Sequence, residues 1–213
     1  MHIAEGILSV PVLVTGTLLS FSGIALGLKQ LEYERIPQVA LLSAAFFVVS
    51  LIHLPLGFSN IHLILNGLIG LLLGWAVFPA LWIALLLQAI FFGFGGLTVL
   101  GVNTVNMALP AIICFYLFNY LIRSTLKNRT VFIYGFMVGI LSVAITIFMV
   151  AISLLATHES FWSLVQLMLI THFPLMIVEG IMSGMIIMFL RQIRPEILLA
   201  PLTGQIEAYR ASI

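Results

Sequence analysis

The most constraining feature of this sequence is a succession of long apolar runs that begins near residue 6 and continues to about residue 190. Hydrophobic residues make up 62% of the 213 residues and charged residues only 7%, whereas an average soluble domain has about 25% charged residues. So few polar side chains cannot cover the surface of a water-soluble globule of this size. We therefore expect a chain that is embedded in lipid and has no soluble domain.

The apolar runs are long enough to predict membrane-crossing helices, at about 20 residues for each span. We expect an all-α polytopic membrane protein in which residues 1–213 form a single membrane-embedded domain. Loop signals separate the runs at 55–61 and at Phe78-Pro79. The prediction is seven transmembrane helices, at 6–28, 38–54, 62–78, 80–100, 103–122, 131–156 and 161–190, with a short cytoplasmic tail at 195–213.

The basic residues predict the orientation of this bundle. All of them follow the first, fifth or seventh predicted helix: Lys29, Arg35, Arg123, Lys127, Arg129, Arg191, Arg194 and Arg210. Odd-numbered helices end on the same side, which the positive-inside rule identifies as the cytoplasm. We expect the N-terminus outside and the C-terminus in the cytoplasm, in a multi-pass protein of the cytoplasmic membrane. No Lys or Arg precedes the first run, so we expect no cleaved secretory signal and a mature chain that begins at Met1.

Met1 and His2 stand directly before the first apolar run and could form a metal chelate. The terminal amine, the backbone nitrogen of His2 and its Nδ1 can bind one ion through fused five- and six-membered rings. One further imidazole completes four nitrogens, a set that suits a square-planar ion such as Ni(II) or Cu(II). We expect His62 to supply it, because the predicted topology puts it on the same side. The alternatives are a solvated N-terminus for His2 and a helix-end histidine bonded to a carbonyl for His62.

Other polar residues lie within or beside the apolar runs. Three amides could hydrogen-bond the metal-binding segment or, alternatively, link neighbouring helices: Gln88, Asn103 and Asn106. Glu5, at the entry to the first helix, is expected either to interact with the positive end of the helix dipole or, as we favour, to be an ordinary acid of the cap region. His172 and Glu179 are seven residues apart on one helix face, which indicates a polar network or a transport pathway. We favour the network.

Several motifs of enzymes and pumps are missing from the sequence. There is no G-x-x-x-x-G-K-[ST] loop, so the chain cannot hydrolyse ATP alone, and neither H-E-x-x-H nor G-x-S-x-G occurs. We expect no catalytic residues, no resident cofactor and no nucleic-acid partner. The glycines of Gly93-Phe94-Gly95-Gly96 lie in a predicted span, where they indicate tight helix packing or local unwinding.

Four blocks of the sequence resemble the CbiM/NikM family: Met-His-Ile-Ala-Glu-Gly at 1–6, Ser59-Asn60-Ile61-His62-Leu63 leading into Gly67, LLLQAIFFGFGGLTVLGVNTVNMALP at 85–110, and HFPLMIVEG at 172–180. The resemblance implies the substrate-binding S component of an energy-coupling factor (ECF) transporter for Co2+ or Ni2+. It also implies an extra N-terminal helix that threads the amino terminus into the pocket. The ligands would then be the Met1 amine, the backbone nitrogen and ring of His2, and the ring of His62.

The same resemblance implies the partners of the chain. These are cytoplasmic ATPase subunits, a membrane coupling (T) subunit and often a small accessory membrane protein, all in contact with membrane lipid. Nickel and cobalt members share the ligands, so the resemblance does not choose between the metals. Two other functions remain open: a membrane-embedded metal-dependent enzyme, which needs an open coordination position and a nearby base, and a metal-free scaffold of a membrane complex.

Overall fold

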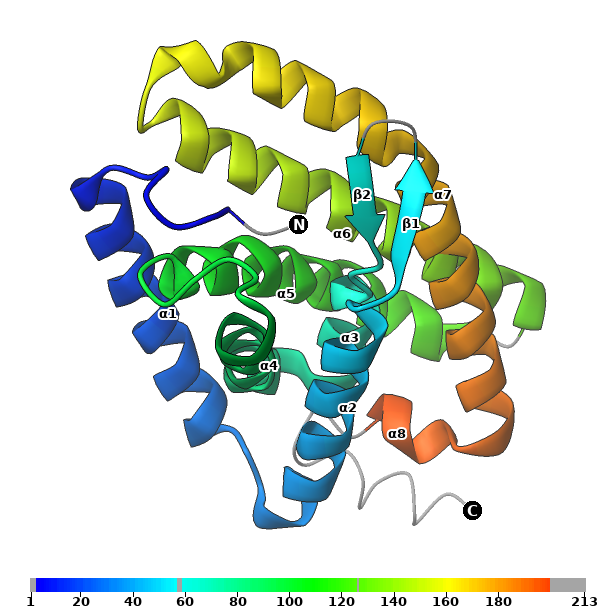
Figure 1. Cartoon of the computed structure of the whole chain (residues 1–213). Coiled ribbons are helices and arrows are strands. Elements are labelled where there is room, and N and C mark those ends of the chain that lie inside the picture. Colours follow the sequence, from blue (N-terminus) through cyan, green and yellow to red (C-terminus); the bar gives the residue numbers. More distant parts are fainter. Residues whose placement is uncertain (1–2, 57–58, 126, 200–213) are drawn as a thin grey trace.

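The computed structural model describes residues 3–56, 59–125 and 127–199, and these are mostly helical (Figure 1). Two short strands form an antiparallel hairpin in which His53 lies opposite His62. The elements in chain order are α1 Val10–Lys29, a 3-10 turn Tyr33–Arg35, α2 Ile36–Val49, β1 His53–Leu56, β2 Ser59–His62, α3 Asn66–Leu73, a 3-10 turn Gly74–Ala76, α4 Val77–Phe92, α5 Leu100–Ser124, α6 Asn128–Leu155, a 3-10 turn Glu159–Phe161, α7 Trp162–Ile193 and α8 Pro195–Leu199.

Five helical stretches among the described residues are long and apolar enough to cross a membrane: Val10–Lys29, Asn66–Phe92, Leu100–Ser124, Asn128–Leu155 and Glu159–Ile193. The 14 residues of α2 extend about 21 Å at 1.5 Å per residue, less than the roughly 30 Å of a hydrocarbon core. The expectation of a helical, multi-pass membrane protein holds. The count of seven spans is not confirmed by these helices. Of the predicted tail, 195–199 forms α8, and 200–213 lies outside the described residues.

The largest difference from the predicted spans lies between residues 62 and 100. The third predicted span begins only at Asn66, because residues 62–65 are not helical. The break before α4 falls at Gly74, whose φ of 57° ends α3, and not at Phe78-Pro79. Pro79 is instead the third residue of α4, where a first-turn proline is tolerated because no helical hydrogen bond needs its missing N–H.

The fourth predicted span also ends early, at Phe92 in place of residue 100. Residues 93–99 leave the helix, and Gly93, Gly95 and Gly96 adopt φ values of 67°, 75° and 133°. These are backbone conformations that glycine adopts at little cost. Of the two interpretations of this glycine-rich stretch, local unwinding is therefore the one confirmed.

The short helix α3 lies at the centre of the bundle, and all eight of its residues are buried. Small residues allow the close approach: a Cβ on Gly67 would lie 2.5 Å from Ser142 Oγ of α6, and one on Gly70 would lie 2.6 Å from the Cβ of Ala111 in α5. Figure 1 shows α3 enclosed by the longer helices. A helix of this length, about 12 Å, is thus covered by protein on every side.

Hydrogen bonds between distant segments define the two ends of the bundle. At one end, Glu5 N–H donates to Gly95 O at 3.0 Å and Ser9 N–H donates to Thr157 Oγ1 at 3.2 Å. At the opposite end, three arginines donate to backbone carbonyls of other elements: Arg35 to Leu72 O, Arg123 to Leu198 O and Arg191 to Ile122 O. The N-terminal segment therefore shares one end with the start of α5 and the end of α6, and the arginines gather at the other.

Candidate metal centre

His62, the last residue of β2, is the predicted imidazole ligand that the structure describes. Its side chain is 8% exposed, and its Nδ1 lies 3.0 Å from Leu63 O. Because a carbonyl oxygen only accepts hydrogen bonds, this contact assigns the proton to Nδ1 and the ring lone pair to Nε2. A histidine that binds metal usually has its other nitrogen bonded in this way.

The surroundings of His62 also favour its neutral form. Only 8% of the His62 side chain is exposed, and a charged imidazolium is costly to bury. Metal binding requires an unprotonated imidazole. The buried position therefore suits a metal ligand, as it also suits a helix-end histidine bonded to a carbonyl.

Met1 and His2, the other predicted ligands, lie outside the described residues, but the chain directly after them is held tightly. Ile3 is 4% exposed. Its N–H donates to Asn103 Oδ1 at 3.0 Å, and Asn103 Nδ2 donates to Ile3 O at 3.1 Å. One amide side chain thus satisfies both backbone groups of Ile3, the residue directly after His2, much as a neighbouring strand would.

Glu5 gives this segment a second anchor. Its carboxylate accepts from Thr98 N–H at 3.0 Å, and this hydrogen bond lowers the pKa of Glu5 below its ordinary value. The prediction that Glu5 serves the start of the first helix is wrong. Since α1 begins only at Val10, the chain turns back and Glu5 lies instead beside the residues that precede α5.

The two remaining amides bond between helices in the described part of the chain. Gln88 is fully buried in α4 and donates to Ser50 Oγ at the end of α2. Asn106 in α5 accepts from Ser153 Oγ of α6 at 3.3 Å. These contacts fit the alternative that both amides link helices.

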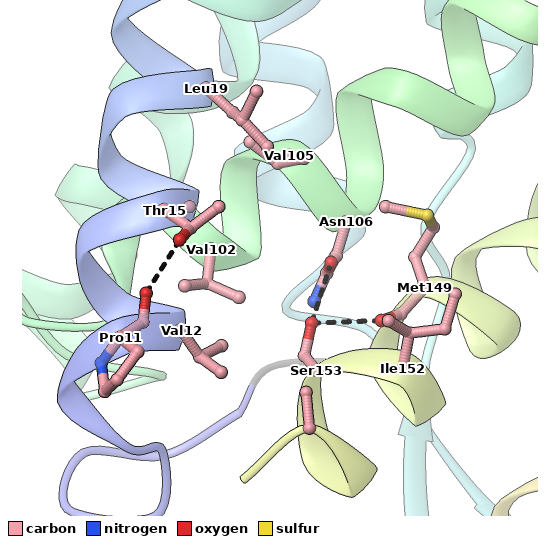
Figure 2. A pocket seen from close by; sticks show the side chains of 12 residues that line it. Pro11, Val12, Thr15, Leu19, Val102, Val105, Asn106, Met149, Ile152 and Ser153 are labelled. Atoms are coloured by element: carbon pink, nitrogen blue, oxygen red, sulfur yellow. Dashed lines mark hydrogen bonds between the residues drawn. The ribbon is translucent and has the colours of Figure 1, made fainter.

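A cavity of about 370 Å³ opens beside the N-terminal segment, between α1, α5 and α6 (Figure 2). Its walls are mainly apolar, with Val102, Val105 and Met149 among them, and its polar groups are amides or hydroxyls such as those of Asn106 and Ser153. Among the described residues that line it, none is a histidine, cysteine or acid. The described part of its lining therefore offers no imidazole, thiol or carboxylate to a metal ion. Among the residues that the structure describes, no group of three or more His, Cys, Asp or Glu side chains could hold a metal ion.

One face of α7 meets the segment that carries His62. His172 is buried in α7, and its Nδ1 contacts Met168 O at 2.8 Å. Glu179, seven residues further on, is fully buried and accepts hydrogen bonds from the N–H groups of Ile64 and Leu65. Glu179 stood out in the sequence as a charged residue inside an apolar run. Nothing in the sequence indicated that it would bind the backbone amides of Ile64 and Leu65.

Comparison with known proteins gives consistent matches. Residues 2–197 match the CbiM family, described as the cobalt uptake substrate-specific transmembrane region. A protein of Haemophilus influenzae named for metal transport is 45% identical over 202 residues, which cover 93% of this chain and 97% of that protein. The fused nickel transport protein NikMN of Rhodobacter capsulatus is 45% identical over 82 residues, covering 38% of this chain and 24% of that protein.

A solved structure of a transition metal transporter has the same fold. It superposes with a TM-score of 0.75 and covers 97% of this chain and 99% of its own, at 21% sequence identity. At that identity the similarity concerns the fold alone. The structural similarity extends over nearly all the helices described above.

Proposed function

Because the chain belongs to the CbiM family of cobalt and nickel transport components, we propose that it captures Co2+ or Ni2+ at the outer face of the cytoplasmic membrane. It acts as the S component of an ECF-type uptake transporter. The metal ion is the transported substrate and not a resident cofactor. The protein itself is no enzyme, and partner subunits hydrolyse ATP.

The proposed metal ligands are the Met1 amine, the backbone nitrogen and Nδ1 of His2, and Nε2 of His62. The observation that carries this proposal is the position of Ile3, which is buried and bound through both backbone groups by Asn103. A freely solvated N-terminus would not need such an anchor directly after His2. The proton on Nδ1 of His62 further supports coordination through its Nε2.

The proposed topology has seven passes, with the N-terminus outside and the C-terminus in the cytoplasm. The gathering of the arginine contacts at one end of the bundle and of the N-terminal contacts at the other supports it. In this topology α3 and the irregular residues 62–65 make the third pass together. Irregular backbone at membrane depth is tolerated where protein covers it, and residues 62–65 are buried.

The proposed partners are cytoplasmic ATPase subunits, a membrane coupling (T) subunit and a small accessory membrane protein. The chain has no phosphate-binding loop of its own, so movement of the metal needs an outside energy source. The NikMN relative is a fused protein, and the segment similar to this chain covers 24% of it. This supports a partner that in some relatives is part of the same polypeptide.

Metal analysis of the purified protein tests this proposal. Protein with a native N-terminus is exposed to a mixture of Ni2+, Co2+ and Zn2+, washed, and its metal content is measured. We expect about one equivalent of Ni2+ or Co2+. Absence of both metals from correctly folded protein would support the metal-free scaffold, and an open coordination position in X-ray absorption spectra would support the enzyme.

Replacement of His62 gives the first prediction. His62→Ala should abolish stable Ni2+ and Co2+ binding, because it removes the one described ligand. His158→Ala is the matched control, since His158 is an exposed histidine in the turn before α7, and it should bind normally. His53→Ala should also bind normally. Wild-type affinity in His62→Ala would remove His62 from the site.

A further inference from the structure

Glu179 is an acid in the interior of a membrane helix, and its carboxylate binds the backbone of a distant segment. Its side chain has no exposed surface. Both of its oxygens accept from Leu65 N–H, at 3.0 and 2.8 Å, and one also accepts from Ile64 N–H. Glu179 therefore serves two successive amides 114 and 115 residues away in the chain.

These two amides need an acceptor from outside their own segment. They lie in the buried, non-helical stretch before α3, and the first N–H groups of a helix have no partner within it. A buried backbone N–H without an acceptor is strongly unfavourable. Leu65 also adopts a φ of 48°, which is uncommon for a residue other than glycine. The Glu179 carboxylate thus holds a backbone conformation that the segment has little tendency to adopt alone.

The amide of Ile64 belongs to the same planar peptide group as the carbonyl of Leu63. In a trans peptide the N–H and the C=O point in opposite directions. The N–H of this group donates to Glu179, while its carbonyl bonds to Nδ1 of His62 at 3.0 Å. A single rigid peptide therefore connects the carboxylate of α7 to the imidazole of His62.

We propose that Glu179 is a positioning residue of the metal centre: through the Leu63–Ile64 peptide it sets the orientation and tautomer of His62, so that Nε2 faces the metal ion. Metal-binding histidines commonly donate their other N–H directly to a carboxylate or a carbonyl. Here the carbonyl is itself fixed by a carboxylate on the far side of its peptide. The inference rests on the proposed function, because it takes His62 as a ligand.

The test compares variants of Glu179 in the full-length protein with a native N-terminus. In Glu179→Gln only one side-chain oxygen remains to accept hydrogen bonds. The NH2 group that replaces the other oxygen is itself a donor, so it cannot accept from the N–H of Ile64 or Leu65. We expect the Kd for Ni2+ to rise by about 10- to 100-fold, the range typical for loss of a group that orients a metal ligand. We also expect the visible absorption of the Ni2+-saturated protein to shift. Glu179→Asp keeps both oxygens, and its Kd for Ni2+ should lie between that of the wild-type protein and that of Glu179→Gln.

Ser183→Ala is the matched control, because Ser183 lies one turn further along α7 and is also fully buried. It should bind Ni2+ with wild-type affinity and an unchanged spectrum. Wild-type affinity and spectrum in Glu179→Gln would overturn the inference, as would equal losses in Glu179→Gln and Ser183→Ala. If Glu179→Gln does not fold, Glu179→Asp decides, and wild-type affinity and spectrum there overturn the inference. Failure of the wild-type protein to bind either Ni2+ or Co2+, or normal binding by His62→Ala, would contradict the proposed function instead.

Discussion

Asn103 illustrates how one side chain can fix the course of a chain terminus. Its amide both accepts from and donates to the backbone of Ile3, and it lies in the first turn of α5, a helix in which most residues are buried. Because Ile3 directly follows His2, any displacement of Ile3 also displaces the proposed chelate. We therefore expect Asn103 to determine how well the N-terminal ligands are placed.

The second prediction is that Asn103→Ala weakens Ni2+ binding without unfolding the bundle. The variant leaves the N–H and the carbonyl of Ile3 unsatisfied in a buried place, at a cost of about 1–3 kcal/mol for each lost partner. A loss of about 1.4 kcal/mol in binding corresponds to tenfold in Kd, so calorimetry should show a rise of at least about tenfold. Asn119→Ala, a buried amide near the other end of the same helix, is the control. Equal affinities for Ni2+ in Asn103→Ala and Asn119→Ala would show that the contact between Asn103 and Ile3 does not contribute to metal binding.

At the residue scale, the sequence singled out polar side chains that the structure shows to be buried, such as Asn103 and Glu179, but it did not predict all of their partners. Asn103, His62 and Glu179 stand out because a polar group in an apolar run requires a partner. Their partners depend on which helices pack together, and that information is not local. Asn106 and Gln88 carry the same signal as Asn103, yet the structure bonds them to Ser153 and Ser50.

At the scale of elements, apolar run length predicted α1, α5, α6 and α7 well and failed between residues 62 and 100. A helix buried on all sides, such as α3, is as apolar as a lipid-facing span, so its length cannot be read from hydrophobicity. The ends of these helices are instead indicated by glycines. Gly74 ends α3, and the glycines after Phe92 end α4. The 93–99 turn thus begins eight residues earlier than the predicted end of the span at residue 100 implies, and it leaves room for Glu5.

The third prediction concerns the contact of Glu5 with this turn. The N–H of Thr98 lowers the pKa of Glu5, so the contact stabilises the folded protein at pH values above the ordinary pKa. That stabilisation is lost as the pH falls through the lowered, folded-state value. Glu5→Gln should therefore reduce the thermal midpoint at pH 7, and the difference from wild type should disappear in acid. The same series in about 1 M salt is the control, because salt screens general charge effects. A difference that grows in acid would contradict the assignment.

At the scale of the whole molecule, α3 is held at both ends by charged side chains from other elements. The Glu179 carboxylate meets the amides at its start, and Arg35 donates to Leu72 O near its end at 3.2 Å. Each charge is of the sign that the helix dipole favours at that end. The short helix thus joins the His62 segment to the end of the bundle where the arginines gather, which is the proposed cytoplasmic side.

The fourth prediction is that the isolated chain in lipid vesicles binds metal but does not concentrate it. The sequence has no G-x-x-x-x-G-K-[ST] loop, and in the proposed function partner subunits hydrolyse the ATP that drives movement. Accumulation of radioactive Ni2+ should stay near equilibrium and should rise only when the ATPase and coupling subunits are reconstituted with ATP. Strong accumulation by the chain alone would indicate a secondary transporter, with His172 and Glu179 as candidates for a proton relay.

The last prediction is that an N-terminal extension abolishes metal binding while a C-terminal one does not. An added residue converts the Met1 amine into an amide and removes its basic lone pair. The burial of Ile3, which is 4% exposed and bound by Asn103, makes the effect larger, because an extension has to be accommodated next to a segment already enclosed by α5. A C-terminal tag leaves the Met1 amine unmodified, and the last described element, α8, is contacted by Arg123 at the opposite end of the bundle.

The measurement is calorimetry with Ni2+ on both tagged proteins. The control is proteolytic removal of the N-terminal tag. Proteolytic removal that leaves Met1 as the first residue should restore binding, whereas removal that leaves one extra residue should not. This comparison separates the amine from general damage, since the two cleaved proteins differ by a single residue. Normal binding by intact N-terminally tagged protein would exclude Met1 as a ligand and would leave His2 and His62 as an incomplete set.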